Sequence, residues 1–335
     1  MPFAGRLRPS ARSVSVACAA FAAFFWATNF ILGAAVIDAI PPASLVFLRW
    51  GLAAVPLLVV AQIMERPDWS AVRRHFGSQF LQGALGMAIA PLFLYMALQH
   101  TSAFNASFVG SVNPILIALA AAVFLGERLT ARVGLGAVMA CTGVVAVLFG
   151  GNAAAAGAGA TGVGLGELMM CGNLALWVVY TMLGRKSSPE VPPMTATAVQ
   201  ATIAAVVALA LTPLEGGPVL PATGPQWLAI AGIAAFPSLV AYLLWARALR
   251  GLEAGSAGAF LALNPVVVAV FTVAMGQSVS ALQIFGGAVV IGGVLLANGV
   301  TVHVPRWLRH VPGASEPAHS PVIQALPQAG VGYLR

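Results

Sequence analysis

The sequence repeats at a spacing of 151 residues, and this duplication constrains the possible fold more than any other feature. Asn113-Pro114 recurs as Asn264-Pro265, 151 positions later, and apolar residues surround both pairs. The same spacing, with a one-residue slip in its last part, relates further pairs: Trp26 and Trp177, Pro42 and Pro193, Arg49 and Gln200, Leu98 and Leu249, Gly126 and Gly276, Gly136 and Gly286, and Gly143 and Gly293. A duplicated set of apolar segments predicts two halves with the same helical architecture.

Both halves consist of apolar segments long enough to cross a membrane. Only 7% of the residues are charged and 60% are hydrophobic, and the mean hydropathy is +0.93, so a water-soluble fold is excluded. A membrane-crossing helix needs about 20 mostly apolar residues. The candidate segments are 14–37, 43–63, 77–98, 103–125, 133–149, 163–183, 194–211, 227–246, 254–275 and 281–300.

The basic residues fall on one side of these segments. If successive loops alternate between the two sides of the membrane, fifteen of the sixteen Lys and Arg residues lie on the side of the N-terminus. Arg49, inside a segment, is the exception. The positive-inside rule therefore predicts a multi-pass protein of the plasma (inner) membrane with both termini cytoplasmic. The net charge of +7 does not indicate a nucleic-acid partner, because the basic residues form no stripe interleaved with aromatic residues.

Five segments per half is an odd number, so the second half crosses the membrane in the opposite sense to the first. The expected fold class is an all-α integral membrane protein with ten transmembrane helices arranged as two inverted five-helix repeats. The expected organisation is a cytoplasmic N-terminus (1–13), a first repeat (14–150), a Gly/Ala external linker (151–162), a second repeat (163–302) and a disordered cytoplasmic tail (303–335). Such repeats share a cavity near the midplane that opens alternately to each side.

Several short motifs accompany the duplication in a fixed order. They are Trp26-Ala27-Thr28-Asn29, Pro41-Pro42, Leu48-Arg49-Trp50, Ala97-Leu98, Asn113-Pro114 and Leu125-Gly126-Glu127-Arg128-Leu129-Thr130, then Trp177, Ala248-Leu249, Asn264-Pro265, Gly276 and Gly286-Gly287. Over roughly residues 15–300, their order and spacing resemble the drug/metabolite transporter superfamily, in particular ten-span proteins with two EamA repeats. The resemblance implies a secondary transporter, most often an exporter, of small organic metabolites such as amino acids. Gln277 and Gln200 depart from the residues expected opposite Glu127 and Arg49, so the two halves are expected to make unequal contacts.

The two prolines predict a break in the fourth span of each half. Pro114 and Pro265 donate no backbone hydrogen bond and clash with the carbonyl four residues earlier. A carbonyl freed in this way must face protein or a water-filled cavity. Asn113 and Asn264, beside the breaks, are therefore expected to bind freed backbone or substrate. The alternative is a packing kink stabilised by Asn, and the symmetric position of the breaks favours a cavity.

Aromatic and polar residues at the predicted middle depth are candidates for the lining of that cavity. Aromatic rings stack on organic substrates and polar groups orient them. The candidate substrate-binding residues are Trp26, Asn29, Tyr95, Asn113, Trp177, Tyr180, Tyr242 and Asn264. Trp227 lies at a segment end and is expected to be an interfacial anchor.

Arg49 is a charge inside a predicted span, where a charge is costly and commonly functional. It is a possible charge partner of the substrate. The alternative is a structural Arg satisfied by helix-end carbonyls or by Asp38. Gln200 at the repeat-related position favours the structural alternative, because that position functions without a charge.

The sequence contains no constellation that would carry catalysis or hold a metal. No carboxylate lies at mid-depth, and the histidines and cysteines lack metal-ligand spacing. We expect no catalytic residue, cofactor or metal, and the cysteines are expected to be small buried side chains. The expected partners are a small-molecule metabolite and the lipid bilayer, with a monomer or homodimer as the assembly. A membrane-embedded enzyme and a channel or scaffold are the alternatives to a carrier, and substrate counterflow would separate them.

Overall fold

The structure is a computed structural model that describes residues 11–126, 130–155, 164–185, 187–252 and 259–297. These residues belong to the first of the chain's two units, Met1–Val300, and their regular secondary structure is entirely helical. Eight helices in the described ranges are long and apolar enough to cross a membrane, and Phe260–Ala274 and Ala281–Ala297 are shorter apolar helices. The fold class predicted from the sequence, an all-helical membrane protein with ten spans, is confirmed.

The five spans of the first half are formed by nine helical elements. They are α1 (Ala11–Val36), α2 (Pro42–Met64), a corner helix α3 (Trp69–Arg74), then α4 (Phe76–Gln82), η1 (Gly83–Ile89) and α5 (Ala90–Leu98), then α6 (Ala103–Gly110) and α7 (Asn113–Leu125), and α8 (Ala131–Ala155). Helix α8 continues through Ala155, where the sequence predicted the start of a flexible linker. The rest of that predicted linker lies outside the described residues.

The second half repeats this order. Its elements are α9 (Leu165–Arg185), α10 (Pro193–Leu211) with η2 (Thr212–Glu215), α11 (Gly224–Ala235) with η3 (Phe236–Val240) and α12 (Ala241–Ala248), η4 (Ala259–Ala262) with α14 (Leu263–Ala274), and α15 (Ala281–Ala297). The prediction that the cysteines are buried is wrong, because Cys141 and Cys171 are exposed on the outer surface of their helices. An apolar side chain that faces lipid needs no protein cover, so burial does not follow from an apolar run.

The fourth span of each half is interrupted where the Asn-Pro pairs predicted a break. Helix α6 ends at Gly110 and α7 begins at Asn113. In the second half, a short 3-10 helix, η4, gives way to α14 at Leu263. Gly126 and Gly276 follow the two broken spans with left-handed backbones, at φ 69° and 78°. A left-handed glycine ends a helix without steric cost, which explains this repeated pair.

A second interruption, which the sequence analysis missed, lies in the third span of each half. The π-helical segments η1 and η3 occupy corresponding positions, since residues 85–89 of η1 fall on 236–240 at the 151-residue offset. A π turn loosens the backbone hydrogen-bond ladder and is frequent at functional sites. Carbonyls in and beside η1 accept from side chains instead: Met87 O from Trp50 Nε1 at 2.6 Å and Ala90 O from Asn173 Nδ2 at 2.7 Å.

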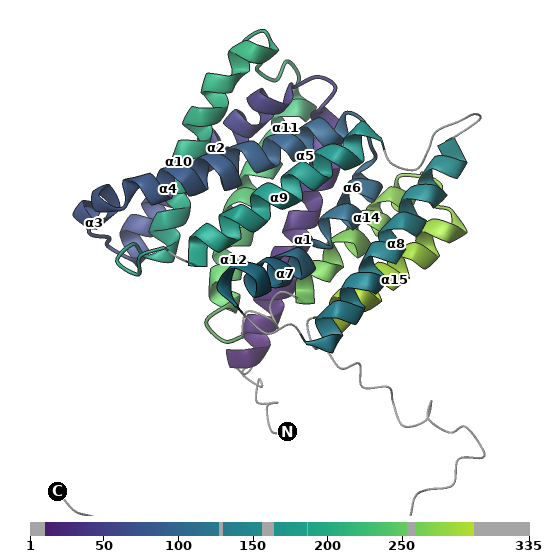
Figure 1. Cartoon of the computed structure of the whole chain (residues 1–335). Helices are drawn as coiled ribbons and strands as arrows, with labels where there is room; N and C mark the ends of the chain where they lie inside the picture. The colour runs from purple at the N-terminus through teal and green to yellow at the C-terminus, as the bar shows by residue number, and fades with distance from the viewer. Residues whose placement is uncertain (1–10, 127–129, 156–163, 186, 253–258, 298–335) are drawn as a thin grey trace, which may run out of the picture. The chain divides into compact units, whose positions relative to one another are not determined.

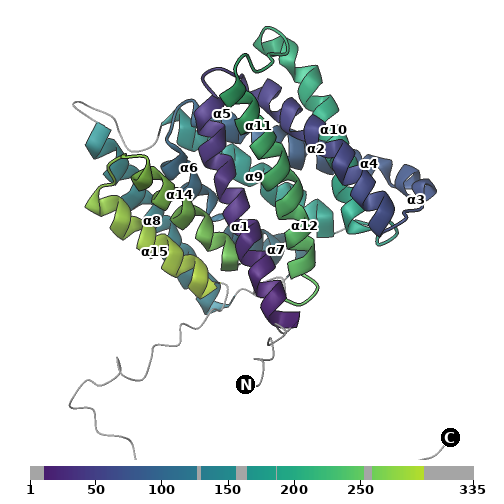
Figure 2. The same ribbon diagram turned by 180° about the vertical axis from the view of Figure 1, so that it is seen from behind.

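The two halves interlock through their first spans. Helix α1 packs against α12 and α14 of the second half, and α9 packs against α5 and α7 of the first. Helix α9 crosses the face seen in Figure 1, and α1 crosses the face seen from behind in Figure 2. The first span of each half therefore packs against helices of the other half, as expected for inverted repeats around a shared centre.

Helices α8 and α15, the last spans of the two halves, form a closely packed pair on one side of the bundle (Figure 1). A Cβ atom on Gly136 would lie 2.5 Å from the carbonyl oxygen of Gly293, and one on Gly143 would lie 2.6 Å from that of Gly286. Only glycine permits this approach of two backbones. The four repeat-related glycines therefore have a packing role.

Helices α2 and α10 are joined by a reciprocal pair of carboxylate caps. Glu65, directly after α2, accepts hydrogen bonds from the backbone N–H groups of Met194 (3.0 Å) and Thr195 (2.8 Å) at the start of α10. Glu215, at the end of η2, accepts from the N–H of Ala43 (3.0 Å) at the start of α2. A carboxylate at a helix N-terminus satisfies free N–H groups and complements the helix dipole. Each helix is thus capped by a residue that follows the other.

Candidate functional site

Arg49 is the centre of a buried polar cluster to which both halves contribute. Its side chain is only 5% exposed. The Nη1 atom donates to Tyr95 Oη at 3.1 Å and to Asn29 Oδ1 at 3.3 Å, and Nε donates to Ser238 Oγ at 3.0 Å. These three partners come from α1, α5 and η3. The cluster therefore links three spans of the first half to the π-helical segment of the second.

The partners of Arg49 are themselves held in place. Tyr95 Oη donates to Asn29 Oδ1 at 2.8 Å, and Ser238 Oγ donates to the carbonyl of Ile233 at 2.8 Å. The guanidinium carbon lies 4.6 Å from the centre of the Trp50 ring, a cation–π distance. Because each partner has a second hydrogen bond, the direction of the guanidinium is fixed before any ligand arrives.

Aromatic rings extend the cluster away from Arg49. Trp50 contacts Tyr242 edge to face, with ring centres 6.0 Å apart, and Tyr242 contacts Trp26 in the same way at 5.7 Å. Trp26 also lies 5.2 Å from Trp245. Edge-to-face pairs at these distances are favourable. A continuous series of rings therefore leads from the charge to α1 and α12.

The repeat-related position of Arg49 is the centre of a second, uncharged cluster. Gln200 Nε2 donates to Gln79 Oε1 at 2.8 Å, and Tyr180 Oη donates to Gln200 Oε1 at 3.2 Å. The Tyr180 ring lies 5.2 Å from that of Trp177 and fills the space beside Gly86 of η1, where any Cβ atom would collide with it. Glycine is therefore required at position 86 for Tyr180 to lie against the π-helical segment.

The amide oxygens of Asn113 and Asn264 are buried and have no hydrogen-bond partner among the described residues. The only other side-chain atom of this kind in the described part of the chain is Ser15 Oγ. The sequence analysis expected these amides to bind freed backbone or substrate. Their oxygens bind no backbone group, and a buried polar atom without a partner is costly. Both halves therefore keep a buried amide oxygen without a partner at the same repeat-related position.

The structure thus brings some of the predicted site residues together and separates others. Arg49, Asn29 and Tyr95 are joined by hydrogen bonds, Trp26 and Tyr242 are in contact, and Trp177 and Tyr180 form a second contact. Neither helix-end carbonyls nor Asp38 bind Arg49, so both suggested structural partners are wrong. The sequence analysis missed Trp50, Ser238 and Gln79 as neighbours.

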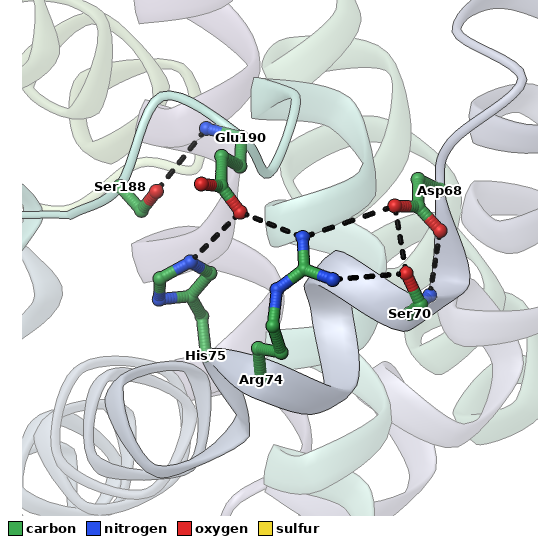
Figure 3. A network of polar contacts seen from close by, with 6 residues as sticks. All are labelled: Asp68, Ser70, Arg74, His75, Ser188 and Glu190. Atoms are coloured by element: carbon green, nitrogen blue, oxygen red, sulfur yellow. Dashed lines mark hydrogen bonds and ion pairs between the residues drawn. The ribbon is translucent and has the colours of Figure 1, made fainter.

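A separate polar network lies at the end of the bundle that the basic loops predict to be cytoplasmic. Arg74 Nη2 contacts Glu190 Oε2 at 2.9 Å, and His75 Nε2 lies 3.2 Å from the same oxygen (Figure 3). Hydrogen bonds from Arg74 and then His75 lower the pKa of Glu190, and hydrogen bonds from Ser70 lower the pKa of Asp68. The network connects the corner of α3 and α4 to the segment between α9 and α10. The side chains of Arg74, Asp68 and Glu190 are more than half exposed and that of His75 is about one-third exposed, so each ion pair is weak.

Comparison with known proteins agrees with the duplication. The sequence model of the family described as "EamA-like transporter family" matches residues 14–149 and again 164–299. The uncharacterized transporter YyaM of Bacillus subtilis is 28% identical over 285 residues, which cover 84% of this chain and 92% of that protein. A solved crystal structure with 23% identity superposes with a TM-score of 0.63 and covers 89% of this chain and 99% of its own.

Two further relatives have names that state a substrate. A probable terminal-alkyne amino-acid exporter of Streptantibioticus cattleyicolor is 28% identical over 83% of this chain and 91% of its own length. The aromatic amino acid exporter YddG of Ancylobacter novellus is 25% identical over 84% of this chain and 93% of its own length. The matches extend over nearly the whole length of each relative.

Proposed function

The chain belongs to the EamA-like transporter family, and from this premise we propose that it is a secondary exporter of small amino-acid-like metabolites. Its membership and its named relatives make it a multi-pass membrane transporter and not an enzyme. The proposal adds a substrate class, a direction, and a location in the inner membrane with both termini cytoplasmic. The one-sided distribution of basic residues supports this orientation.

The observation that carries the proposal is the polar and aromatic cluster built by both repeats. Arg49 of the first half donates to Ser238 of the second, and Trp50 contacts Tyr242, so relative movement of the halves alters the cluster directly. In transporters with inverted repeats, substrate sites lie at the repeat interface and rocking exposes them alternately to each side. Asn29, Tyr95, Trp26 and Tyr242 are accordingly proposed as substrate-binding residues.

The second cluster and the two helix breaks complete the proposed binding region. Trp177 is the second-half counterpart of Trp26, and Tyr180 is the counterpart of Asn29. Asn113 and Asn264 supply unpartnered amide oxygens. An organic cation such as a substrate ammonium group would provide the missing donors. Two relatives at 25% and 28% identity are named exporters of amino acids, which supports an amino-acid-like substrate for this chain.

Counterflow in proteoliposomes tests the proposal. Vesicles with the purified full-length protein are loaded with one unlabelled amino acid at a time and given trace labelled amino acid outside. We expect transient accumulation of label for a subset that includes aromatic amino acids. Trp26→Ala should reduce the rate, whereas Trp227→Ala, at an exposed ring on α11, should leave it unchanged. Equal leakage in protein-free vesicles, or flux without saturation, contradicts a carrier.

Labelling of single cysteines tests the orientation. Cys141 and Cys171 are exposed, so they must be replaced by Ala before reporter cysteines are introduced. A reporter at residue 217 should react with an impermeant maleimide from outside the cell, and a reporter at residue 74 should react only after the membrane is permeabilised. The reverse pattern contradicts the proposed topology.

A further inference from the structure

Arg49 is a buried cation without a counter-ion in the described part of the chain. Its three hydrogen-bond partners, Asn29, Tyr95 and Ser238, are all neutral. The ion pairs of Arg74 and His75 with Asp68 and Glu190 lie elsewhere in the bundle, and none of them includes Arg49. Neutral dipoles and an aromatic face solvate a cation, but they do not neutralise its charge. A charge kept within a membrane span implies a partner that this part of the protein does not supply.

The fold itself does not require a cation at this position. Gln200 occupies the repeat-related place on α10 and is only 4% exposed. It bonds to Gln79 and Tyr180, so a neutral amide satisfies the same packing environment in the second half. Helix packing therefore does not explain why the first half has a guanidinium. The difference between the halves is one of charge.

The guanidinium has unused donors. Nε and Nη1 are occupied, whereas Nη2 makes no hydrogen bond with any described residue. Nη2 is also not one of the described atoms that are both unpartnered and fully buried, so it keeps some accessible surface. Its two N–H groups are thus available on a guanidinium that lies over the Trp50 ring, and Trp50 in turn contacts Tyr242. A planar anion with an organic body fits this combination of donors and rings.

We infer that Arg49 is the binding site for the carboxylate of the transported molecule, with Nη2 as the donor and the Trp50–Tyr242–Trp26 rings around the organic body. The inference deepens the proposed function and rests on it. It names a substrate class: small organic acids, amino acids included, that carry one carboxylate next to an apolar or aromatic group. An analogue without the carboxylate leaves Arg49 uncompensated and binds more weakly.

Three probes of the same size test this assignment on the purified full-length protein. They are L-phenylalanine, 3-phenylpropionate, which lacks the amine, and L-phenylalaninamide, which lacks the carboxylate. Binding is measured by calorimetry or by ligand-dependent thermal stabilisation in detergent. Wild-type protein should bind the two acids about 10- to 100-fold more tightly than the amide, as expected for one charged hydrogen-bonded contact. Equal binding of all three probes, or binding of none, overturns the inference.

Variants then locate the contact. Arg49→Gln, which copies the second half, should lose the preference for the acids, while Arg49→Lys should keep part of it because the charge remains. Arg132→Gln, at an exposed arginine on α8, is the control and should bind all three probes like the wild type. Unchanged acid preference in Arg49→Gln places the carboxylate elsewhere. If Arg49→Gln does not fold, the wild-type acid-to-amide ratio and Arg49→Lys still decide the question.

Counterflow and the acid preference of Arg49→Gln together distinguish a wrong assignment of Arg49 from a wrong proposed function. If counterflow proceeds while Arg49→Gln keeps its preference for acids, the protein is a carrier and the Arg49 assignment is wrong. If the wild-type protein binds the acids through Arg49 and shows no counterflow of any amino acid, the assignment holds and the carrier proposal is wrong.

Discussion

The unpartnered amide oxygens of Asn113 and Asn264 are the clearest single-residue sign that the two helix breaks are more than kinks. Packing alone would favour Leu, which has nearly the same shape and no polar group to bury. Burying an amide oxygen without a donor costs about 1–3 kcal/mol. Retaining this cost at both repeat-related positions is consistent with a role in transport, because functional sites commonly keep such strain.

Asn113→Leu and Asn264→Leu are therefore expected to separate stability from transport. Each substitution removes an unsatisfied group, so the thermal midpoint in detergent should stay the same or rise, by up to the equivalent of about 1–3 kcal/mol. The counterflow rate should fall in both variants. Val266→Ala, at a more exposed position on α14, is the control. A lower midpoint with normal counterflow would show that these amides support packing only.

The sequence predicts the breaks but not the partners of Arg49, and the physical reason is distance along the chain. A proline removes a hydrogen bond wherever it stands, so Pro114 and Pro265 act locally. The contact from Arg49 to Ser238 joins residues 189 positions apart and depends on how the whole bundle packs. The π-helical segment that positions Ser238 contains Pro237, a local signal that the sequence analysis did not use.

At the scale of elements, the α8–α15 pair depends on glycines whose neighbours leave no room for a side chain. Gly136→Ala places a Cβ atom 2.5 Å from the Gly293 carbonyl oxygen, so the helices must separate. We expect a loss of about 1–3 kcal/mol, measured as a lower thermal midpoint. Gly134→Ala is the matched control on the same helix, because nothing lies within 4 Å of its added Cβ. Equal effects of the two variants would contradict close packing as the reason for Gly136.

The reciprocal caps give a second prediction at this scale. Glu65→Ala and Glu215→Ala each leave N–H groups free at the start of the partner helix, at a cost of about 0.5–2 kcal/mol. Because the caps lie at opposite ends of the α2–α10 pair, the losses should add in the double variant. Glu65→Gln, which keeps an acceptor, should lose less than Glu65→Ala. A thermal midpoint unchanged in both Ala variants would show that water replaces the caps without cost.

A sequence signal for these caps existed. Glu65 and Glu215 are 150 positions apart, the same slipped spacing that relates the glycines of the last spans. Two acidic residues that follow repeat-related helices at the repeat spacing predict equivalent roles. The duplication is enough to infer that the two residues have equivalent roles. The N–H groups that they cap could be identified only from the structure, because the partner helix is more than 120 positions away in each case.

At the scale of the whole molecule, the network of Arg74, His75 and Glu190 connects the two halves at one end of the bundle (Figure 3). The pKa of Glu190 is lowered from the ordinary carboxyl value of 4.5. The ionised carboxylate therefore adds to the free energy of unfolding above pH 4.5, and this stabilisation is lost as the pH falls through the lowered pKa. The midpoint difference between wild type and Glu190→Gln should therefore be small at pH 7 and vanish in acid. A difference that grows with acidity contradicts this sign.

A charge exchange tests whether this connection matters for transport. Arg74→Glu places like charges opposite each other and should change the counterflow rate, and the double variant Arg74→Glu with Glu190→Arg should restore it. Exchange of an exposed basic residue elsewhere, Arg250→Glu, is the control. Failure of the double variant to recover would mean that Arg74 acts through a partner other than Glu190.

The reciprocal caps also set an order of events during synthesis. The ribosome makes Glu65 before α10, so the acceptor for Met194, 129 residues further on, is already in place when α10 emerges. The opposite holds for α2, whose Ala43 N–H must wait until Glu215 has been made 172 residues later. Two contacts that are equivalent in the folded structure therefore become possible at different stages of synthesis. The nascent first half leaves the insertion machinery with an open helix end, and only the arrival of the second half closes it.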